Sequence, residues 1–207
     1  MTEPMLPYEI FRRQDESADE RFYDFPRFVT HIDEAAIEAV TELYREFFRA
    51  NGAILDLMSS WVSHLPEERF FSRVAGIGMN AAELATNPRL TERSVQNLNG
   101  TSDLPFGEAE FDGAAICVSV QYLIRPIEVF REIARVSKEN APLVVTFSNR
   151  CFPTKAVFAW NALDDAGHIE LVSEYFTASE SYTEVEIRRH EPRGGDPLFG
   201  VIGRAKK

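Results

Sequence analysis

The chain has 207 residues and a mass of 23.5 kDa, with 44% hydrophobic and 27% charged residues, which predicts a single domain with a layered core. The formal net charge of −11 would repel a phosphate backbone and argues against nucleic acid as a partner. No apolar run approaches the roughly 20 residues of a membrane-spanning helix, and the first residues lack the pattern of a secretory signal. We therefore expect a cytoplasmic protein with neither a membrane nor a nucleic-acid partner. The composition leaves the oligomeric state open.

The N-terminal region divides into a polar arm and the start of a domain. Residues 1–22 are rich in charge and poor in core-forming side chains, so they predict an arm that is mobile or lies over a domain spanning 23–207. Residues 33–49 predict a helix, since their apolar positions repeat at helical spacing. Asn51-Gly52 ends this helix, and a short buried strand follows at 53–57.

The rest of the chain alternates between strand and helix signals. Strands are expected at 73–79, 91–98, 111–120 and 143–147, with room for a helical turn near 59–65, and helices at 81–85, from Pro126, within 152–167 and at 168–177. Residues 182–190 and 198–204 predict a terminal hairpin. This order predicts a three-layer Rossmann-like α/β sheet of about seven strands, mostly parallel, with an antiparallel C-terminal hairpin strand.

A ligand of such a sheet is expected outside the carboxyl ends of the strands, near the point where the strand order reverses. The segments that follow the strand ends are Asp56–Ser60, Gly78–Asn80, Asn97–Asn99 and Ser119–Tyr122. We expect the functional side chains to come from these segments.

Three sequence stretches indicate a family. Ile54-Leu55-Asp56-Leu57, Val74-Ala75-Gly76-Ile77, and Leu104-Pro105-Phe106 before Phe111-Asp112 resemble a class I S-adenosylmethionine-dependent methyltransferase of the type 11 group, over about residues 52–147. The resemblance implies S-adenosylmethionine as cofactor and an unidentified acceptor, a small molecule or a protein, of which we favour the small molecule. It places the sulfonium near Met58–Ser60, the ribose near Met79 and Asn80, and the adenine beside Asn97 and Leu98.

The cofactor positions depart from the common family pattern. The loop after Asp56 carries Met58, Ser59 and Ser60 and lacks the usual glycines, although a serine at position 60 still permits a close approach of the ligand. Gly78 stands where an acid usually accepts the ribose hydroxyls, which leaves Asn80 as a substitute acceptor or simply as a helix cap. The altered positions together resemble a less common methyltransferase-like branch that shares them, and this resemblance extends to Arg27 and His31.

Candidate roles follow from these positions. Tyr122 and Asn149 lie where the fold would place groups facing the acceptor, and ordinary loop capping is the structural alternative. His31 is a candidate base and Arg27 a candidate partner for a carboxylate of cofactor or substrate, unless both are ordinary surface groups. The residues assigned to the cofactor are Asp56, Met58, Ser59, Ser60, Gly78, Met79, Asn80, Asn97, Leu98, Ser119 and Arg27, those assigned to catalysis are Tyr122, His31 and Asn149, and no metal site is expected.

Two other functions fit parts of the sequence. A non-enzymatic or degenerate cofactor-binding module that regulates or scaffolds a partner would explain the missing ribose acid. A nicotinamide-dependent oxidoreductase would need a glycine-rich fingerprint after the first strand, and residues 58–63 contain no glycine. Methyl transfer therefore remains the favoured function.

Overall fold

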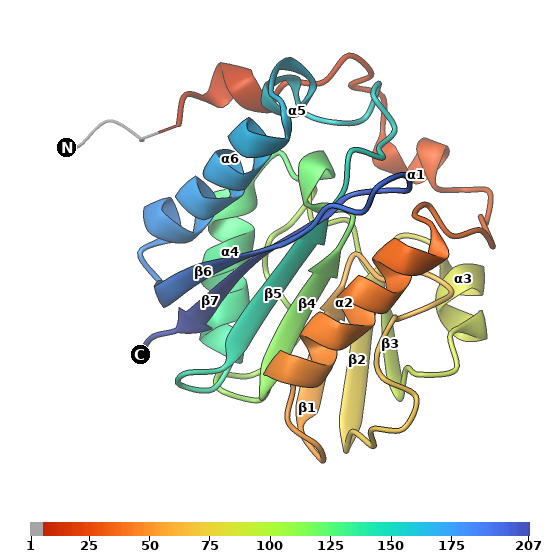
Figure 1. Ribbon diagram of the computed structural model, residues 1–207, viewed down its shortest axis with the longest axis vertical. Helices are drawn as coiled ribbons and strands as arrows, with labels where there is room; N and C mark the ends of the chain where they lie inside the picture. Colours follow the sequence, from red (N-terminus) through yellow and green to blue (C-terminus); the bar gives the residue numbers. More distant parts are fainter. Residues whose placement is uncertain (1–5) are drawn as a thin grey trace.

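The computed structural model describes residues 6–207, which form one seven-stranded sheet flanked by helices (Figure 1). The strands are β1 (Ala53–Leu57), β2 (Arg73–Gly78), β3 (Glu92–Val95), β4 (Gly113–Cys117), β5 (Pro142–Phe147), β6 (Tyr182–His190) and β7 (Leu198–Ala205). The α-helices are α1 (Asp19–Phe22), α2 (Glu34–Phe47), α3 (Ala81–Thr86), α4 (Pro126–Val136), α5 (Phe158–Ala162) and α6 (Asp165–Ser179), with short 3-10 helices η1 (Tyr8–Phe11) and η2 (Val120–Tyr122). Residues 1–5 of the predicted N-terminal arm lie outside the described residues.

The strand order is β3-β2-β1-β4-β5-β7-β6. The strands from β3 to β5 are parallel, whereas β7 runs antiparallel to β5 and β6 antiparallel to β7. Strands β1, β2, β4 and β5 are buried along almost their whole length, as expected for parallel strands covered on both faces. The predicted fold class is confirmed, and the order reverses between β1 and β4.

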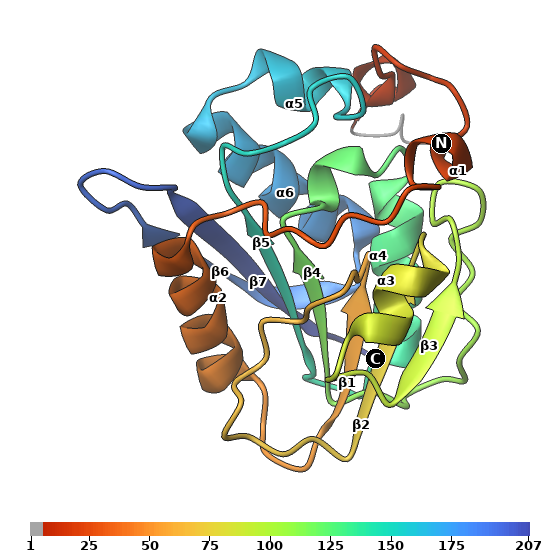
Figure 2. The ribbon, with the colours of Figure 1, turned by 90° about the vertical axis from the view of Figure 1, so that its right-hand side faces the viewer.

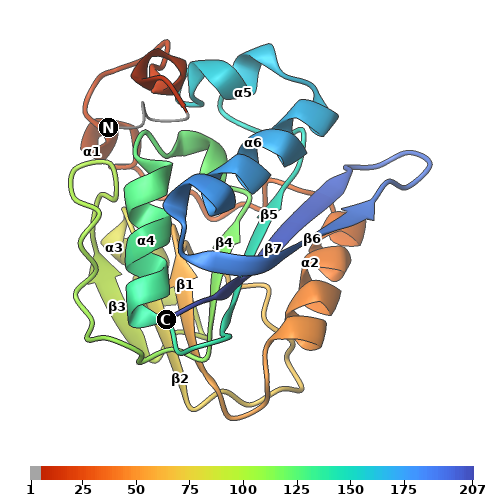
Figure 3. The same ribbon diagram turned by 90° about the vertical axis from the view of Figure 1, so that its left-hand side faces the viewer.

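Helices cover both faces of the sheet. On one face, α2 presents Val40 and Leu43 to a core that includes Leu84 of α3 and Val144 of β5. On the other face, α4 and α6 share a core in which the Phe130 and Phe176 rings lie 4.9 Å apart, edge to face. Figure 3 shows the sheet between α2 on one side and the α4–α6 pair on the other. In this three-layer arrangement the helices cover the two faces of the sheet and leave the ends of its strands uncovered.

The connection between β1 and β2, residues 58–72, contains no helix, although a helix is the usual crossover between parallel strands. Side chains hold this loop instead. The Arg89 guanidinium donates to the carbonyls of Pro66 and Arg69 at 3.1 and 2.9 Å. The Arg69 guanidinium in turn donates to the Arg45 carbonyl of α2 at 2.6 Å. Because these carbonyls have side-chain partners, the loop is held without helical hydrogen bonds, and the helical turn considered in this stretch does not form.

The N-terminal segment of the described chain runs across the carboxyl ends of the strands before it enters α2 (Figure 2). It pairs with the chain ahead of α5 through backbone hydrogen bonds, from the Asp15 amide to the Thr154 carbonyl at 2.8 Å and from the Phe158 amide to the Arg12 carbonyl at 2.6 Å. Residues 6–33 therefore cover the carboxyl ends of the strands, where a ligand is expected.

The other elements follow the sequence prediction closely. Asp33 caps α2 by accepting a hydrogen bond from the Ala36 amide at 2.9 Å. The strand expected at 91–98 shortens to the edge strand β3, and the helical signal within 152–167 yields only the short α5, because Asp164 caps a new helix, α6. Within the described chain, no helix is both long and apolar enough to span a membrane.

Candidate functional site

A cavity of about 360 Å³ lies between the carboxyl ends of β1, β2 and β4 and the N-terminal segment. It brings together all but one of the site residues expected from the sequence: Arg27, His31, Asp56, Met58, Ser59, Ser60, Gly78, Met79, Asn80, Asn97, Leu98, Ser119 and Tyr122. Asn149 is exposed and does not line the cavity. The topology thus gathers segments that are far apart in the chain at one place.

The loop after β1 turns back onto the end of β2. Met58 has a φ of 53°, so the left-handed backbone conformation that favours glycine is adopted here by methionine. The Ser59 amide donates to the Ile77 carbonyl at 2.7 Å. The Ser59 carbonyl oxygen would lie 2.2 Å from a Cβ atom at Gly78. No side chain fits at position 78 beside this loop, which gives a physical reason for the missing acid.

Asp56 organises this loop. Its carboxylate is buried and accepts hydrogen bonds from the Ser59 hydroxyl at 2.6 Å and from the Ser63 hydroxyl. The Asn87 amide donates to the Ser63 hydroxyl at 2.9 Å and to the Ser60 carbonyl at 2.9 Å. Burial raises the pKa of Asp56 to about 6, opposed by the two serine hydrogen bonds. The Ser59 hydroxyl is thus directed to Asp56, whereas the Ser60 hydroxyl donates to a different carboxylate, that of Glu83.

Glu83 is a cavity residue that sequence reasoning missed. Its buried carboxylate accepts hydrogen bonds from the Ser60 hydroxyl and from the Arg27 amide, both at 2.7 Å. The spacing of Asn80 and Glu83 is typical of a capping box, so the sequence indicates only a helix-capping role for Glu83. In the structure only Asn80 caps α3, accepting from the Ala82 and Glu83 amides. Glu83 therefore places a carboxylate near the end of β2, where Gly78 cannot.

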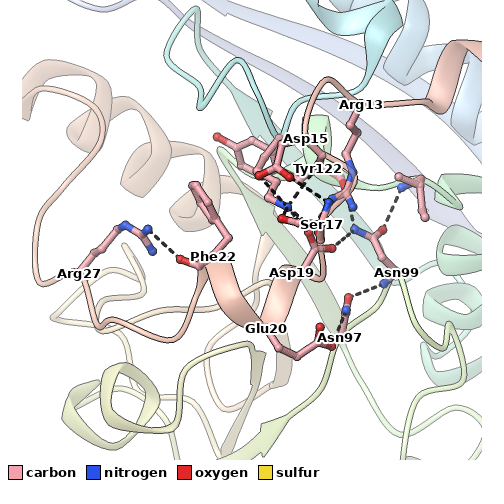
Figure 4. A network of polar contacts seen from close by, with 12 residues as sticks. Arg13, Asp15, Ser17, Asp19, Glu20, Phe22, Arg27, Asn97, Asn99 and Tyr122 are labelled. Carbon is pink, nitrogen blue, oxygen red and sulfur yellow. Dashed lines mark hydrogen bonds and ion pairs between the residues drawn. The ribbon is translucent and has the colours of Figure 1, made fainter.

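The Asn97 side chain faces the N-terminal segment. Its amide group donates to the Glu20 carboxylate at 2.8 Å, and its side-chain oxygen accepts from the Asn99 amide at 2.9 Å. The Asn99 side chain donates to Asp19 and to the Tyr122 carbonyl, both at 2.9 Å. These contacts connect α1 to the ends of β3 and β4 (Figure 4).

A buried ion cluster fixes the same part of the N-terminal segment. Asp19 pairs with Arg13 at 2.7 Å and with the fully buried Lys155 at 3.4 Å. The Lys155 ammonium also donates to the Ser17 carbonyl at 2.7 Å and pairs with Asp15 at 3.2 Å. Figure 4 shows these groups converging beside Tyr122. The cluster makes α1 a fixed wall of the cavity.

Aromatic and titratable groups lie on the side of β4. The Tyr122 hydroxyl accepts from the Phe152 amide at 2.9 Å, and burial raises the pKa of Tyr122 to about 12, so the phenol stays protonated near neutral pH. The His31 ring packs edge-on against Phe152, with centroids 5.2 Å apart. Desolvation, together with the charge of Arg27, lowers the pKa of His31, so its ring is neutral near pH 7 and able to accept a proton.

Three polar atoms of cavity residues have no hydrogen-bond partner within residues 6–207. They are the Ser119 hydroxyl, at the end of β4, the Tyr44 hydroxyl, and one terminal nitrogen, Nη1, of Arg27. Val118, beside Ser119, adopts a φ of 47°, which is strained for a β-branched residue. Buried unpaired groups and backbone strain concentrate at binding sites, because a ligand there supplies the missing partners.

The comparisons with known proteins agree with this geometry. Residues 58–145 match a family model described as a methyltransferase domain. Over this stretch the chain is similar to a methyltransferase domain. The match begins in the loop after β1 and ends in β5, so it includes the ends of β2 and β4 at the cavity, whereas Asp56 of β1 and the N-terminal segment lie outside it. A search of curated proteins finds no match.

Several solved structures share the fold of this chain. A protein from Pyrococcus horikoshii OT3 has a TM-score of 0.62 and 15% identity, over 90% of this chain and 99% of its own. The 1,6-didemethyltoxoflavin-N1-methyltransferase of Burkholderia thailandensis, solved with S-adenosylhomocysteine, has a TM-score of 0.61 and 16% identity, over 84% and 80%. The (4+2)-cyclase SpnF has a TM-score of 0.61 and 14% identity, over 90% and 91%. At these identities the likeness establishes the fold, and the cyclase illustrates that the fold alone does not set the reaction.

Proposed function

We propose that the domain binds S-adenosylmethionine in this cavity and transfers its methyl group to a small-molecule acceptor. The observation that carries the proposal is the position of the cavity, at the carboxyl ends of β1, β2 and β4 where the strand order reverses. Its volume of about 360 Å³ suits a small molecule. The N-terminal segment covers the strand ends, which favours a small acceptor over a protein.

The residues present offer partners for such a cofactor. Ser119 and Arg27 bring unpartnered donors to the cavity, and Asn97 has a side-chain oxygen with a single donor. The bound cofactor would supply an electrophilic methyl group. The protein then has to place the acceptor in line and remove a proton where the acceptor carries one. His31, with its lowered pKa, is the group best suited to accept that proton.

Glu83 takes the place of the missing ribose acid in this proposal. A carboxylate accepts about four hydrogen bonds, and each Glu83 oxygen has one donor in the structure. Both oxygens therefore retain capacity for ribose hydroxyls. Asn80 is less suited, because its side-chain oxygen already accepts from two amides of α3.

Calorimetric titration with S-adenosylmethionine and S-adenosylhomocysteine tests the proposal. We expect both to bind the wild type and to bind Glu83→Gln more weakly. Glu132→Gln is the matched control, because the Glu132 carboxylate is also largely shielded from solvent and accepts from a backbone amide, that of Leu104, but does not line the cavity. Binding of neither compound by the wild type would contradict the proposal.

A non-enzymatic module is the second candidate. In the common family pattern, glycines after the first strand leave room for the cofactor. Here Met58, in the left-handed conformation, and the Ser59 carbonyl, against Gly78, reduce that room. A degenerate module that has lost the cofactor site would bind neither compound and would act through a partner. The same titration therefore separates the two functions.

A further inference from the structure

Arg27 is the cavity residue whose charge has no counterpart. No carboxylate of residues 6–207 lies within ion-pairing distance of its guanidinium; its one hydrogen bond is from Nη2 to the Phe22 carbonyl at 2.8 Å. Nη1 is buried and has no partner among these residues. The Glu83 carboxylate accepts from the Arg27 backbone amide and not from its side chain. Arg27 is half-buried, and a guanidinium nitrogen that is itself buried without a partner is unfavourable unless an anion completes it.

Aromatic rings fix this guanidinium in place. Its central carbon lies 4.5 Å from the centre of the Phe22 ring, 5.5 Å from that of Phe152 and 5.8 Å from that of Tyr23. Phe22 and Phe152 also contact each other edge-on at 5.2 Å. Figure 4 shows the Arg27 guanidinium directed toward Phe22. A guanidinium held in this way is partly stripped of water and loses little conformational freedom when it binds an anion.

The fold removes the alternative means of binding an anion at this place. In nucleotide-binding α/β folds, the amino end of the helix after the first strand usually carries the positive potential for an anionic group. Residues 58–72 contain no helix, so β1 is not followed by such a helix end. Arg27 lines the cavity from the N-terminal segment, which covers the strand ends.

We propose that Arg27, with Phe22 and Phe152, forms a carboxylate-binding subsite of the cavity. The subsite takes the carboxylate of a ligand with a planar or apolar body that packs against Phe152. This inference rests on the proposed function, in which two sources offer a carboxylate: the amino-acid end of the cofactor and the methyl acceptor.

Two pairs of probes distinguish the sources. S-adenosylhomocysteine carries the amino-acid carboxylate, and methylthioadenosine lacks it. Benzoate and benzamide have the same ring but differ in charge, and both are titrated by NMR into protein saturated with S-adenosylhomocysteine. The variants are Arg27→Gln and Arg27→Lys, with Arg150→Gln as control, since Arg150 also lines the cavity but is exposed and pairs with Asp196.

If the acceptor supplies the anion, benzoate binds the wild type about tenfold or more tightly than benzamide, and Arg27→Gln abolishes this difference. If the cofactor supplies it, Arg27→Gln weakens S-adenosylhomocysteine about tenfold or more and leaves methylthioadenosine unchanged. In either case Arg150→Gln behaves as the wild type, and Arg27→Lys retains part of the difference because it keeps the charge. A melting curve of Arg27→Gln confirms that the variant is folded.

The subsite is refuted if Arg27→Gln leaves both differences unchanged. If the wild type binds neither nucleoside, the proposed function fails instead, and the benzoate and benzamide comparison on the protein alone still decides whether Arg27 binds a carboxylate. On the protein without a nucleoside, a preference for benzoate that persists in Arg27→Gln also refutes the subsite.

Discussion

Restoring the family's usual acid at position 78 is expected to damage this domain. In Gly78→Asp, the new Cβ atom would lie 2.2 Å from the Ser59 carbonyl oxygen and 3.1 Å from a methyl carbon of Leu84. The leucine can rotate, but the carbonyl belongs to a loop that is fixed by the hydrogen bond from Ser59 to Ile77. The backbone therefore has to move.

The size of the effect follows from overpacking. Forcing atoms into a packed region costs about 1–3 kcal/mol of the free energy of unfolding. For a chain of this length, 1 kcal/mol corresponds to about 2–4 °C, so Gly78→Asp should lower the melting temperature by roughly 2–12 °C. It should also weaken S-adenosylhomocysteine binding, because the loop after β1 borders the cavity.

Thermal unfolding and calorimetry measure both effects. Gly100→Asp is the matched control: Gly100 is an exposed glycine in a turn, and the nearest atom to its added Cβ is 3.4 Å away, an ordinary contact. Its stability should change by no more than about 0.5 kcal/mol. If Gly78→Asp melts with the wild type and binds S-adenosylhomocysteine more tightly, the loop yields easily and the steric explanation for the missing acid is wrong.

Three further predictions concern buried carboxylates. Because the pKa of Asp56 rises from 3.8 to about 6 on folding, the folded state holds the proton more tightly, and stability should fall by up to roughly 3 kcal/mol as the pH rises from about 4 to 6. Asp56→Asn should flatten this dependence in urea unfolding curves, and an unchanged slope would contradict the assignment. Asp19→Asn should weaken docking of the N-terminal arm by about 3 kcal/mol, because Lys155 loses a buried counter-charge. It should also accelerate tryptic cleavage of the arm, whereas Glu16→Gln, at an exposed position, should not. Glu83→Gln should weaken S-adenosylhomocysteine about 10-fold or more, a charged hydrogen bond contributing about 1.5–3 kcal/mol, and equal affinity would exclude Glu83 from ribose binding.

The sequence by itself determined the secondary structure and the fold class. The apolar runs of β1, β2, β4 and β5 are long enough for buried parallel strands only, and the 3.6-residue period of α2 fixes which side of that helix is buried. The terminal hairpin follows from two strand-like segments, β6 and β7, that flank the turn at residues 192–197. These features depend on apolar runs and periods among residues that are close together in the chain, so they can be read from the sequence.

The sequence also located the candidate site, because strand ends of a parallel sheet meet at one edge. It did not show how the site is closed. The Ser59 carbonyl against Gly78 depends on the path of a loop whose carbonyls are held by Arg89, and nothing local in residues 58–72 specifies that path. A helical turn was an equally reasonable expectation there.

Only the tertiary structure decided which polar side chains face the cavity. Arg27 and Glu83 are 56 positions apart, and Asp19 and Asn99 are 80 apart, yet each pair is joined by a hydrogen bond. Glu83 has the spacing of a helix cap and Asp19 the composition of a solvated arm, so their local patterns predict surface roles. Their burial and partners come from the N-terminal segment folding across the strand ends, and long-range packing of this kind leaves no period or motif in the sequence.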